Sequence, residues 1–219
     1  MVASELISND IVPLRTSDTG DEALSIMHEF FVQHLPIVND EELLGLLSED
    51  DVLAHDAAEA VGSYNIALPH ARARDRDHLY EVMRLVAEYE LTAVPVVDPS
   101  GKYEGLITAA DLLAYYARTT PFTESGSIII LELQRRDYAL SQLARIAESE
   151  DAVILSSFVE STGDGSLLRV TIKVNHEHVQ GILASFERFG YRVAATFNEG
   201  FAVDTLRERY DALINYLNV

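Results

Sequence analysis

The chain contains one sequence pattern twice, at a spacing of about sixty residues. Each copy has an apolar residue, a proline, two apolar residues and an Asp or Asn, at residues 35–39 and again at 94–98. After a short turn, each copy continues as Gly-apolar-apolar-(Ser/Thr)-x-x-Asp-apolar-apolar, at residues 45–53 and 105–113. Many copies with a period of about 20–50 residues would indicate a solenoid. Two copies at the longer spacing predict a tandem pair of small domains.

Each copy is preceded by a stretch whose apolar residues have helical spacing. The two expected inner faces consist of Ala23, Ile26, Met27, Phe30 and Phe31, and of Leu79, Val82, Met83 and Val86. Short apolar runs bounded by turn residues, such as Val96-Val97 and Leu106-Ile107, predict strands. Each repeat is therefore expected to fold as helix, short strand, turn, short strand, helix. A unit this small buries too little surface alone, so the copies should pack sheet to sheet.

This doubled pattern resembles the cystathionine-β-synthase (CBS) domain, which occurs as tandem pairs called Bateman modules. The residues that carry the resemblance are Pro36 with Gly45, Ser48 and Asp51, and Pro95 with Gly105, Thr108 and Asp111. The resemblance covers roughly residues 1–118. It implies a mixed α/β fold in which repeat 1 (residues 1–62) and repeat 2 (residues 63–120) pack as a pseudo-symmetric pair.

The repeated motif is compatible with two roles. Ser48 and Thr108 stand where they would cap the helices that follow, with Asp51 and Asp111 at the third helical position, as in a capping box. A purely structural cap stabilises a helix by about 1 kcal/mol. The same geometry suits a ligand, because a helix N-terminus offers N–H groups to phosphate and a carboxylate can hold ribose hydroxyls. In CBS domains this Ser/Thr and Asp often contact an adenine nucleotide, with the base between apolar strand residues.

Charge distinguishes the two copies. Through Gly62 the only cation is Arg15, against 14 carboxylates, which would repel a polyphosphate. The second copy opens with arginines at 72, 74 and 76, and carries two alanines where the first copy has Glu49 and Asp50. We therefore expect a nucleotide to prefer the second copy, with one or more of these arginines on its phosphates. The alternative is that the arginines form a solvated strand or linker edge.

The resemblance thus implies a set of ligand-binding residues and ligands, and no required cofactor. The residues are Thr108, Asp111, Gly105, Pro95, Val96, Arg72 and Arg74, with Ser48 and Asp51 in the first copy. The candidate ligands are AMP, ADP, ATP and S-adenosylmethionine.

Composition excludes some classes of function. With 36 acidic and 16 basic residues, the net charge of −20 argues against general nucleic-acid binding, which needs a basic face. Only two cations are lysines and there is no cysteine, so we expect adaptation to a salty cytoplasm and no thiolate metal site. No apolar run approaches the roughly 20 residues of a membrane span, and the N-terminus does not resemble a signal peptide. A cytoplasmic protein is expected.

A second domain is expected at residues 128–200, after a linker at 121–127. Its pattern predicts strands at 128–133, 153–160, 167–174 and 192–197 and helices at 138–147 and 178–189. This βαββαβ order is the ferredoxin-like split βαβ motif. After a CBS pair it resembles the ACT domain, a small-molecule sensing module of acetoin-utilisation-type CBS–ACT proteins. ACT domains that bind amino acids often have a glycine where the first strand meets the first helix, and this chain has Arg135-Arg136-Asp137-Tyr138 there.

The remaining segment, residues 201–219, is expected to form a C-terminal helix that docks on the protein, with an apolar stripe of Leu206, Tyr210, Leu213, Ile214 and Leu217. No catalytic motif is recognisable, and His176 and His178 lack a third metal ligand, so we expect neither an enzyme nor a metal site.

The leading hypothesis is a non-catalytic regulatory homodimer that senses an adenine nucleotide or other adenosyl compound through its CBS pair, coupled to the ACT-like module. The alternatives are an oligomerising interaction scaffold without a ligand, and a regulatory subunit of a metabolic pathway such as acetoin utilisation. The sequence leaves open the nucleotide, the regulated target and the dimer geometry.

Overall fold

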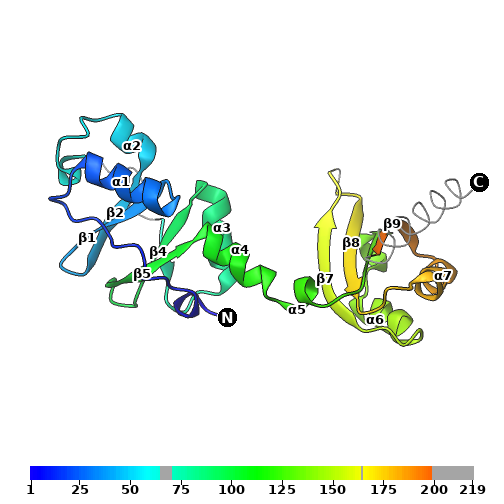
Figure 1. Ribbon diagram of the computed structural model, residues 1–219. Helices are drawn as coiled ribbons and strands as arrows, with labels where there is room; N and C mark the ends of the chain where they lie inside the picture. The colour runs from blue at the N-terminus through cyan, green and yellow to red at the C-terminus, as the bar shows by residue number, and fades with distance from the viewer. Residues whose placement is uncertain (65–70, 164, 199–219) are drawn as a thin grey trace, which may run out of the picture. The chain divides into compact units, whose positions relative to one another are not determined.

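The computed structural model describes residues 1–64, 71–163 and 165–198 (Figure 1). The chain divides into two compact units, Met1–Tyr116 and Ala117–Val219, which we describe separately. The helix expected at residues 201–219 lies outside the described residues. Among the described helices, none combines the length and the apolar character that crossing a membrane requires.

The first repeat has the predicted order of elements. It consists of α1 (Gly20–Phe30), β1 (His34–Asn39), β2 (Glu42–Ser48) and α2 (Glu49–Leu53). Helix α1 begins with a capping box, in which Thr19 Oγ1 accepts the N–H of Glu22 and the Glu22 carboxylate accepts the N–H of Thr19. It ends at Phe31, whose φ of 54° lies in the left-handed region and turns the chain towards β1.

The second repeat has the same local structure, with one additional short strand. It consists of β3 (Ala73–Arg74), α3 (Leu79–Tyr89), β4 (Ala93–Val97), β5 (Tyr103–Thr108) and α4 (Ala109–Ala117). Both hairpins are antiparallel, with Pro36 opposite Leu46 in one and Pro95 opposite Leu106 in the other. Both have an irregularity in register directly after the residue that faces the motif glycine. The repeated sequence is therefore repeated as structure.

The two repeats share their hydrophobic cores. Leu47 of β2 packs in the core of the first repeat, whereas its neighbour Leu46 packs in that of the second. Strand β5 has the equivalent arrangement: Ile107 packs in the core of the second repeat, and its neighbour Leu106 packs in the core of the first. Successive side chains of a strand point to opposite faces, so each strand contributes to both cores. This packing holds the two repeats together as one unit.

Two segments outside the hairpins also pack on the repeats, and the first of them crosses from one repeat to the other. The N-terminal segment lies on the second repeat, where Ala3 N donates to Asp77 O (2.9 Å) and Ser8 N donates to Leu106 O (2.9 Å). The segment after α2 returns to the first repeat, where Val61 N donates to Asp18 O (2.8 Å). The second repeat is thus completed by a segment from the start of the chain, and the first by the segment that follows its own helix α2.

The expected inner faces of α1 and α3 require two corrections. Phe31 is 93% exposed, because it is the left-handed residue that ends α1 and not part of the helix. Met83 is 40% exposed, and Leu85 is buried with Leu79 and Val82 in its place. The buried face of α3 is therefore formed by Leu79, Val82 and Leu85, and Met83 lies outside it.

In its described residues, the second unit is a four-stranded sheet with two nine-residue helices and one four-residue helix. Its elements are α5 (Thr120–Thr123), β6 (Ser127–Gln134), α6 (Leu140–Glu148), β7 (Ile154–Ser161), β8 (Leu167–Val174), α7 (Gln180–Arg188) and β9 (Arg192–Asn198). The strand order is β7-β8-β6-β9, with antiparallel neighbours throughout. The predicted βαββαβ order is found, and the order of strands in the sheet is that of the split βαβ motif.

Helices α6 and α7 cover the same face of the sheet (Figure 1). Alternate residues of β6 and β8 pack against α6 and α7, including Ile129, Leu131, Val170 and Ile172. The opposite face carries Ile128 and Ile130 in the centre. Phe158 in β7 is 64% exposed, and Phe197, which pairs with Ile128, is 58% exposed. Helices α6 and α7 therefore leave this second face without cover from either of them.

Candidate functional site

Both predicted capping boxes form. In the first repeat, Ser48 Oγ accepts the N–H of Asp51 (3.1 Å), and Asp51 Oδ2 accepts the N–H (2.9 Å) and the hydroxyl (2.6 Å) of Ser48. In the second repeat, Thr108 Oγ1 accepts the N–H of Asp111 (3.0 Å), and Asp111 Oδ2 accepts the N–H (3.0 Å) and the hydroxyl (2.7 Å) of Thr108. The shorter Asp therefore replaces the usual Glu or Gln without loss of either bond.

Each box uses only one oxygen of its aspartate. Within the described part of the chain, no hydrogen bond reaches Oδ1 of Asp51 or of Asp111. Both side chains are partly exposed. A carboxylate oxygen accepts about two hydrogen bonds, so each aspartate can cap its helix and still accept hydroxyl groups from a ligand. Capping and ligand binding are therefore compatible at the same residue.

A contact between the repeats brings the two boxes together. His34 lies opposite Ser48 in the first hairpin, and Thr92 directly precedes Ala93, which lies opposite Thr108 in the second. His34 Nδ1 lies 3.1 Å from Thr92 Oγ1 and accepts the N–H of Thr92 (3.3 Å). The Ser48 and Thr108 boxes thus lie on either side of a group of cross-repeat hydrogen bonds, in which Thr92 Oγ1 also accepts the N–H of Gln33 (2.7 Å). Neither His34 nor Thr92 was expected from the sequence, although both stand directly beside the start of an apolar-Pro strand.

The tautomer of the His34 ring follows from this contact, and its protonation state follows from its burial. Because Nδ1 accepts the N–H of Thr92, the proton of the neutral ring is on Nε2. Burial lowers the pKa of His34, and the charges of Asp51 and Asp50 oppose this shift only in part. At neutral pH the ring is therefore neutral and presents one N–H donor between the two boxes.

The strand residues of the predicted site lie in the protein core. Pro95 and Val96 are buried within β4, opposite Leu106 and Gly105. Gly105 has a φ of +147°, and a Cβ on it would lie 2.3 Å from Ile7 Cγ2 in the crossing N-terminal segment. Pro95, Val96 and Gly105 shape the hairpin, and Gly105 leaves space for the N-terminal segment. Thr108 is the last residue of β5, and Asp111 lies in the first turn of α4.

Arg74 lies beside the end of β4 that is farther from Thr108. Strand β3 pairs with β4 in parallel, with Arg74 beside Val97, whereas Thr108 lies opposite Ala93. Ala93 and Val97 are four residue steps apart, so Arg74 lies about 13 Å along β4 from the position opposite Thr108. Arg72 and Arg74 line a pocket of about 820 Å³ with the turn that follows β4. The structure therefore does not place them beside Thr108 and Asp111, as the sequence had led us to expect.

In the described part of the chain, no group of three or more His, Cys, Asp or Glu side chains is arranged to hold a metal ion. His176 and His178 lie in the turn between β8 and α7 and form no such group.

Comparison with known proteins places the repeats in a family. The CBS domain family model matches residues 3–58 and 73–118. Over 120 residues (55% of this chain and 25% of the relative), the chain is 25% identical to an inosine-5'-monophosphate dehydrogenase of Korarchaeum cryptofilum. Over 118 residues (51% of this chain and 26% of the relative), it is 30% identical to the magnesium transporter MgtE of Thermus thermophilus. The chain spans about a quarter of the length of these curated relatives.

Solved structures give similar matches. A CBS domain pair/ACT domain protein from Thermotoga maritima matches with a TM-score of 0.48 and 20% identity, over 53% of this chain and 96% of that one. The crystal structure of CBSX2 in complex with AMP matches with a TM-score of 0.47 and 24% identity, over the same shares. The family model covers both copies of the motif and both capping boxes. Residues 3–58 and 73–118 are therefore a tandem pair of CBS domains.

Proposed function

We propose that this protein is a non-catalytic regulator whose CBS pair binds an adenine nucleotide or another adenosyl compound beside the His34–Thr92 contact. The observation that carries the proposal is the half-used carboxylate of Asp111. Its Oδ2 caps α4, and its Oδ1 is available to accept ribose hydroxyls. This is the role that the resemblance to CBS domains implies for the residue.

The second repeat is the better site on electrostatic grounds. Helix α2 has five residues and three acidic ones in its first turn, whereas α4 has nine residues and only Asp111 there. A short helix with three carboxylates at its N-terminus repels an anionic ligand. We therefore infer that Thr108 and Asp111 form the principal site and Ser48 and Asp51 the weaker one.

The hydrogen bonds at α4 limit what its N-terminus offers to a phosphate. The N–H of Ala109 donates to Thr92 O (2.9 Å), and the N–H of Asp111 donates to Thr108 Oγ1. Ribose recognition by Asp111 is therefore better supported than phosphate recognition by the helix N-terminus. The Nε2–H of His34 is a further donor for the ligand in our proposal.

Thermal unfolding with AMP, ADP, ATP and S-adenosylmethionine tests the proposal. A ligand at about 100 times its dissociation constant adds roughly 2.7 kcal/mol, which raises the melting temperature of a chain this size by about 5–10 °C. Asp111→Ala should abolish the rise. Asp51→Ala is the matched control, because it removes the same cap from the first repeat and should leave most of the rise intact.

Two outcomes would count against the site. If Asp51→Ala and Asp111→Ala reduce the temperature shift equally, the loss reflects helix capping rather than ribose contact. If no adenosyl compound shifts the unfolding of the unmodified chain, the capping boxes have a structural role only, and the alternative function gains support.

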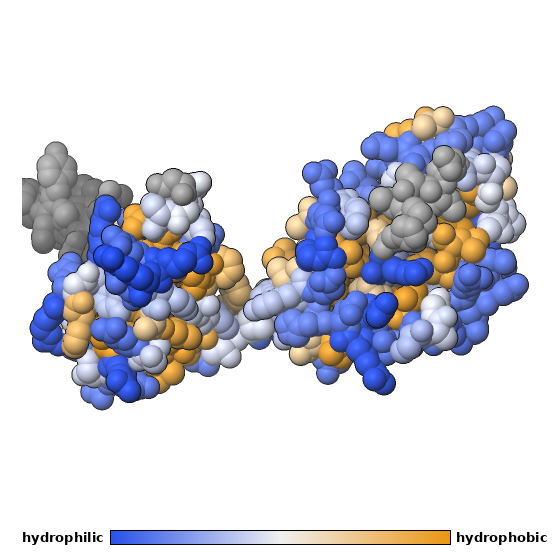
Figure 2. Space-filling model, turned by 180° about the vertical axis from the view of Figure 1, so that it is seen from behind, coloured by the Kyte–Doolittle hydropathy of each residue, from blue (hydrophilic) through white to orange (hydrophobic). Residues whose placement is uncertain are grey.

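The alternative is an interaction scaffold, and the sheet face of the second unit opposite α6 and α7 favours it. Figure 2 shows hydrophobic residues among hydrophilic ones on the surface of both units, and Phe158 and Phe197 are among the most exposed. If this face forms a homodimer, Phe158→Ser with Phe197→Ser should lower the mass measured by sedimentation equilibrium. Leu113→Ser, at a position that is 72% exposed on α4, tests the CBS helices instead.

We also infer the remaining organisation from the order of elements. Residues 121–127 are proposed as a linker, residues 128–200 as an ACT-like domain and residues 201–219 as a terminal helix. The βαββαβ order and strand order support the ACT-like assignment. The regulated target, including a metabolic pathway such as acetoin utilisation, is a hypothesis from the family resemblance.

A further inference from the structure

The second CBS repeat has a charged pocket that is separate from the capping boxes. The pocket has a volume of about 820 Å³ and lies between β3, the N-terminus of α3 and the turn after β4. Ala71 and Ala73 are buried while Arg72, directly before β3, and Arg74, within it, are exposed and both line the pocket. Alternate residues of a strand are about 6–7 Å apart, which places the two guanidinium groups within reach of one small ligand.

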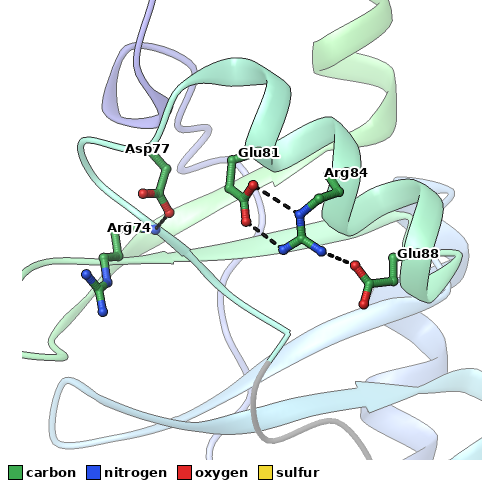
Figure 3. A network of polar contacts seen from close by, with 5 residues as sticks. All are labelled: Arg74, Asp77, Glu81, Arg84 and Glu88. Carbon is green, nitrogen blue, oxygen red and sulfur yellow. Dashed lines mark hydrogen bonds and ion pairs between the residues drawn. The ribbon is translucent and has the colours of Figure 1, made fainter.

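The acidic side chains around the pocket already have partners. Asp77 Oδ2 accepts the backbone N–H of Arg74 (2.8 Å), as Figure 3 shows. Glu81 accepts two hydrogen bonds from Arg84, at 2.6 and 3.0 Å, and Arg84 also pairs with Glu88. These carboxylates are therefore held by groups other than the guanidinium of Arg74.

The acid in the turn is satisfied in the same way. Asp98 Oδ1 accepts the N–H of Ser100 (2.8 Å), its hydroxyl (2.6 Å) and the N–H of Lys102 (2.9 Å). These bonds lower the pKa of Asp98, so the turn stays closed around its own carboxylate at neutral pH. Asp75 lies 3.8 Å from Arg76 and forms an ion pair with it.

Arg72 and Arg74 are left without an acidic partner. Within residues 1–64, 71–163 and 165–198, no carboxylate lies within ion-pair distance of either guanidinium group. Residues 65–70, which directly precede them, contain no Asp or Glu. In Figure 3 the guanidinium of Arg74 points away from Asp77 and Glu81. In a chain with a net charge of −20, two unpaired arginines side by side need an explanation.

The first repeat shows that the fold does not require arginine at positions 72 and 76, although it also has an arginine at the position equivalent to Arg74. The positions equivalent to Arg72, Arg74 and Arg76 hold Pro13, Arg15 and Ser17. The equivalent turn carries Asp40, Glu41 and Glu42 in place of the Pro99-Ser100-Gly101 of the second repeat. The two repeats have the same hairpin but differ in charge at this turn and before it, in the direction that favours an anion in the second repeat.

We propose that this pocket binds the phosphoryl group of a small molecule through Arg72 and Arg74, as a site distinct from Asp111. Planar guanidinium groups bind phosphate oxygens with two parallel hydrogen bonds, which lysine does not do. The proposal does not depend on a nucleotide at the capping boxes, because about 13 Å of strand β4 separates the two places. Binding should weaken with salt, since the pocket is open and its charges are screened.

Calorimetric titration of the full chain with inorganic pyrophosphate at low salt tests the proposal. Arg72→Gln with Arg74→Gln should weaken the affinity about tenfold or more, because charge-assisted hydrogen bonds are lost. Arg72→Lys with Arg74→Lys keeps both positive charges but loses the paired hydrogen bonds of the guanidinium groups, and should weaken binding by less. Asp111→Ala should leave pyrophosphate binding unchanged, which separates this site from the proposed nucleotide site.

A charge-matched control makes the result specific. Arg15→Gln with Arg118→Gln removes two positive charges elsewhere and should leave the affinity within about twofold, because screened long-range effects are small. Equal weakening in this control, unchanged binding in the Arg72/Arg74 variant, or no binding to the unmodified chain would each overturn the proposal. Citrate that binds as tightly as pyrophosphate would overturn the phosphoryl assignment. Circular dichroism checks the fold, since Arg72 and Arg74 have exposed side chains that are free to be replaced.

Discussion

At the residue scale, the capping aspartates combine a structural and a chemical role. Asp111 Oδ2 accepts two bonds from Thr108, and its other oxygen is available to a ligand. An Asn at this position could accept both Thr108 bonds through its amide oxygen but would present an N–H donor in place of the second acceptor oxygen, and a Glu would reach one methylene further. The Ser/Thr-x-x-Asp spacing thus keeps one carboxylate oxygen on the helix and the other at the surface.

His34 provides a prediction at this scale. Its pKa is lowered by burial, so the unfolded chain binds a proton more readily than the folded one, and stability should fall as pH drops below about 6.5. Unfolding in urea at pH 7.5, 6.5 and 5.5 should show a steeper loss in the unmodified chain than in His34→Gln. His28→Gln is the control, because the His28 side chain is 74% exposed. An equal pH dependence in His34→Gln and the unmodified chain would show that His34 does not stay neutral in the fold.

At the element scale, the crossing N-terminal segment decides the shape of the second hairpin. The segment passes over β5 at Gly105, where Ser8 bonds to the next residue of the strand. Only a residue without a Cβ fits there, because Ile7 occupies the space that a Cβ would fill. The motif glycine of the second repeat therefore serves packing between remote segments.

Gly105→Ala should destabilise the first unit by about 1–3 kcal/mol, through overpacking against Ile7 and a left-handed φ. Gly101→Ala is the matched control, because Gly101 also has a positive φ (+91°) but open space around it. Chemical denaturation followed by circular dichroism gives both values. Ile7→Ala in the Gly105→Ala background should recover part of the loss, and no recovery would argue against the Ile7 contact.

At the scale of the whole molecule, charge sets the response to salt. Residues 1–120 carry 22 acidic and 7 basic residues, whereas residues 121–219 carry 14 and 9. Self-repulsion should therefore be stronger in the first unit, and screening by salt should relieve it more there. This distribution is consistent with the expected adaptation to a salty cytoplasm.

We expect the melting temperature to rise between low salt and molar KCl. Amide hydrogen exchange at the two salt concentrations should show a larger gain of protection in residues 1–116 than in residues 127–198, because the first unit carries most of the excess charge. A melting temperature that does not rise with KCl would remove the basis for the salt-adaptation hypothesis.

The sequence alone determined the features that depend on neighbours along the chain. The doubled motif predicted both capping boxes, because a cap joins residues three apart, and hydrophobic periodicity predicted both hairpins and the βαββαβ order. Tertiary structure decided what depends on pairing between remote segments. His34 contacts Thr92, which lies 58 residues later in the chain. The parallel pairing of β3 with β4 places Arg74 beside Val97, and Arg72 and Arg74 line a pocket with the turn after β4. Strand register is fixed by which side chains are buried once the segments meet, so no local pattern could place these residues.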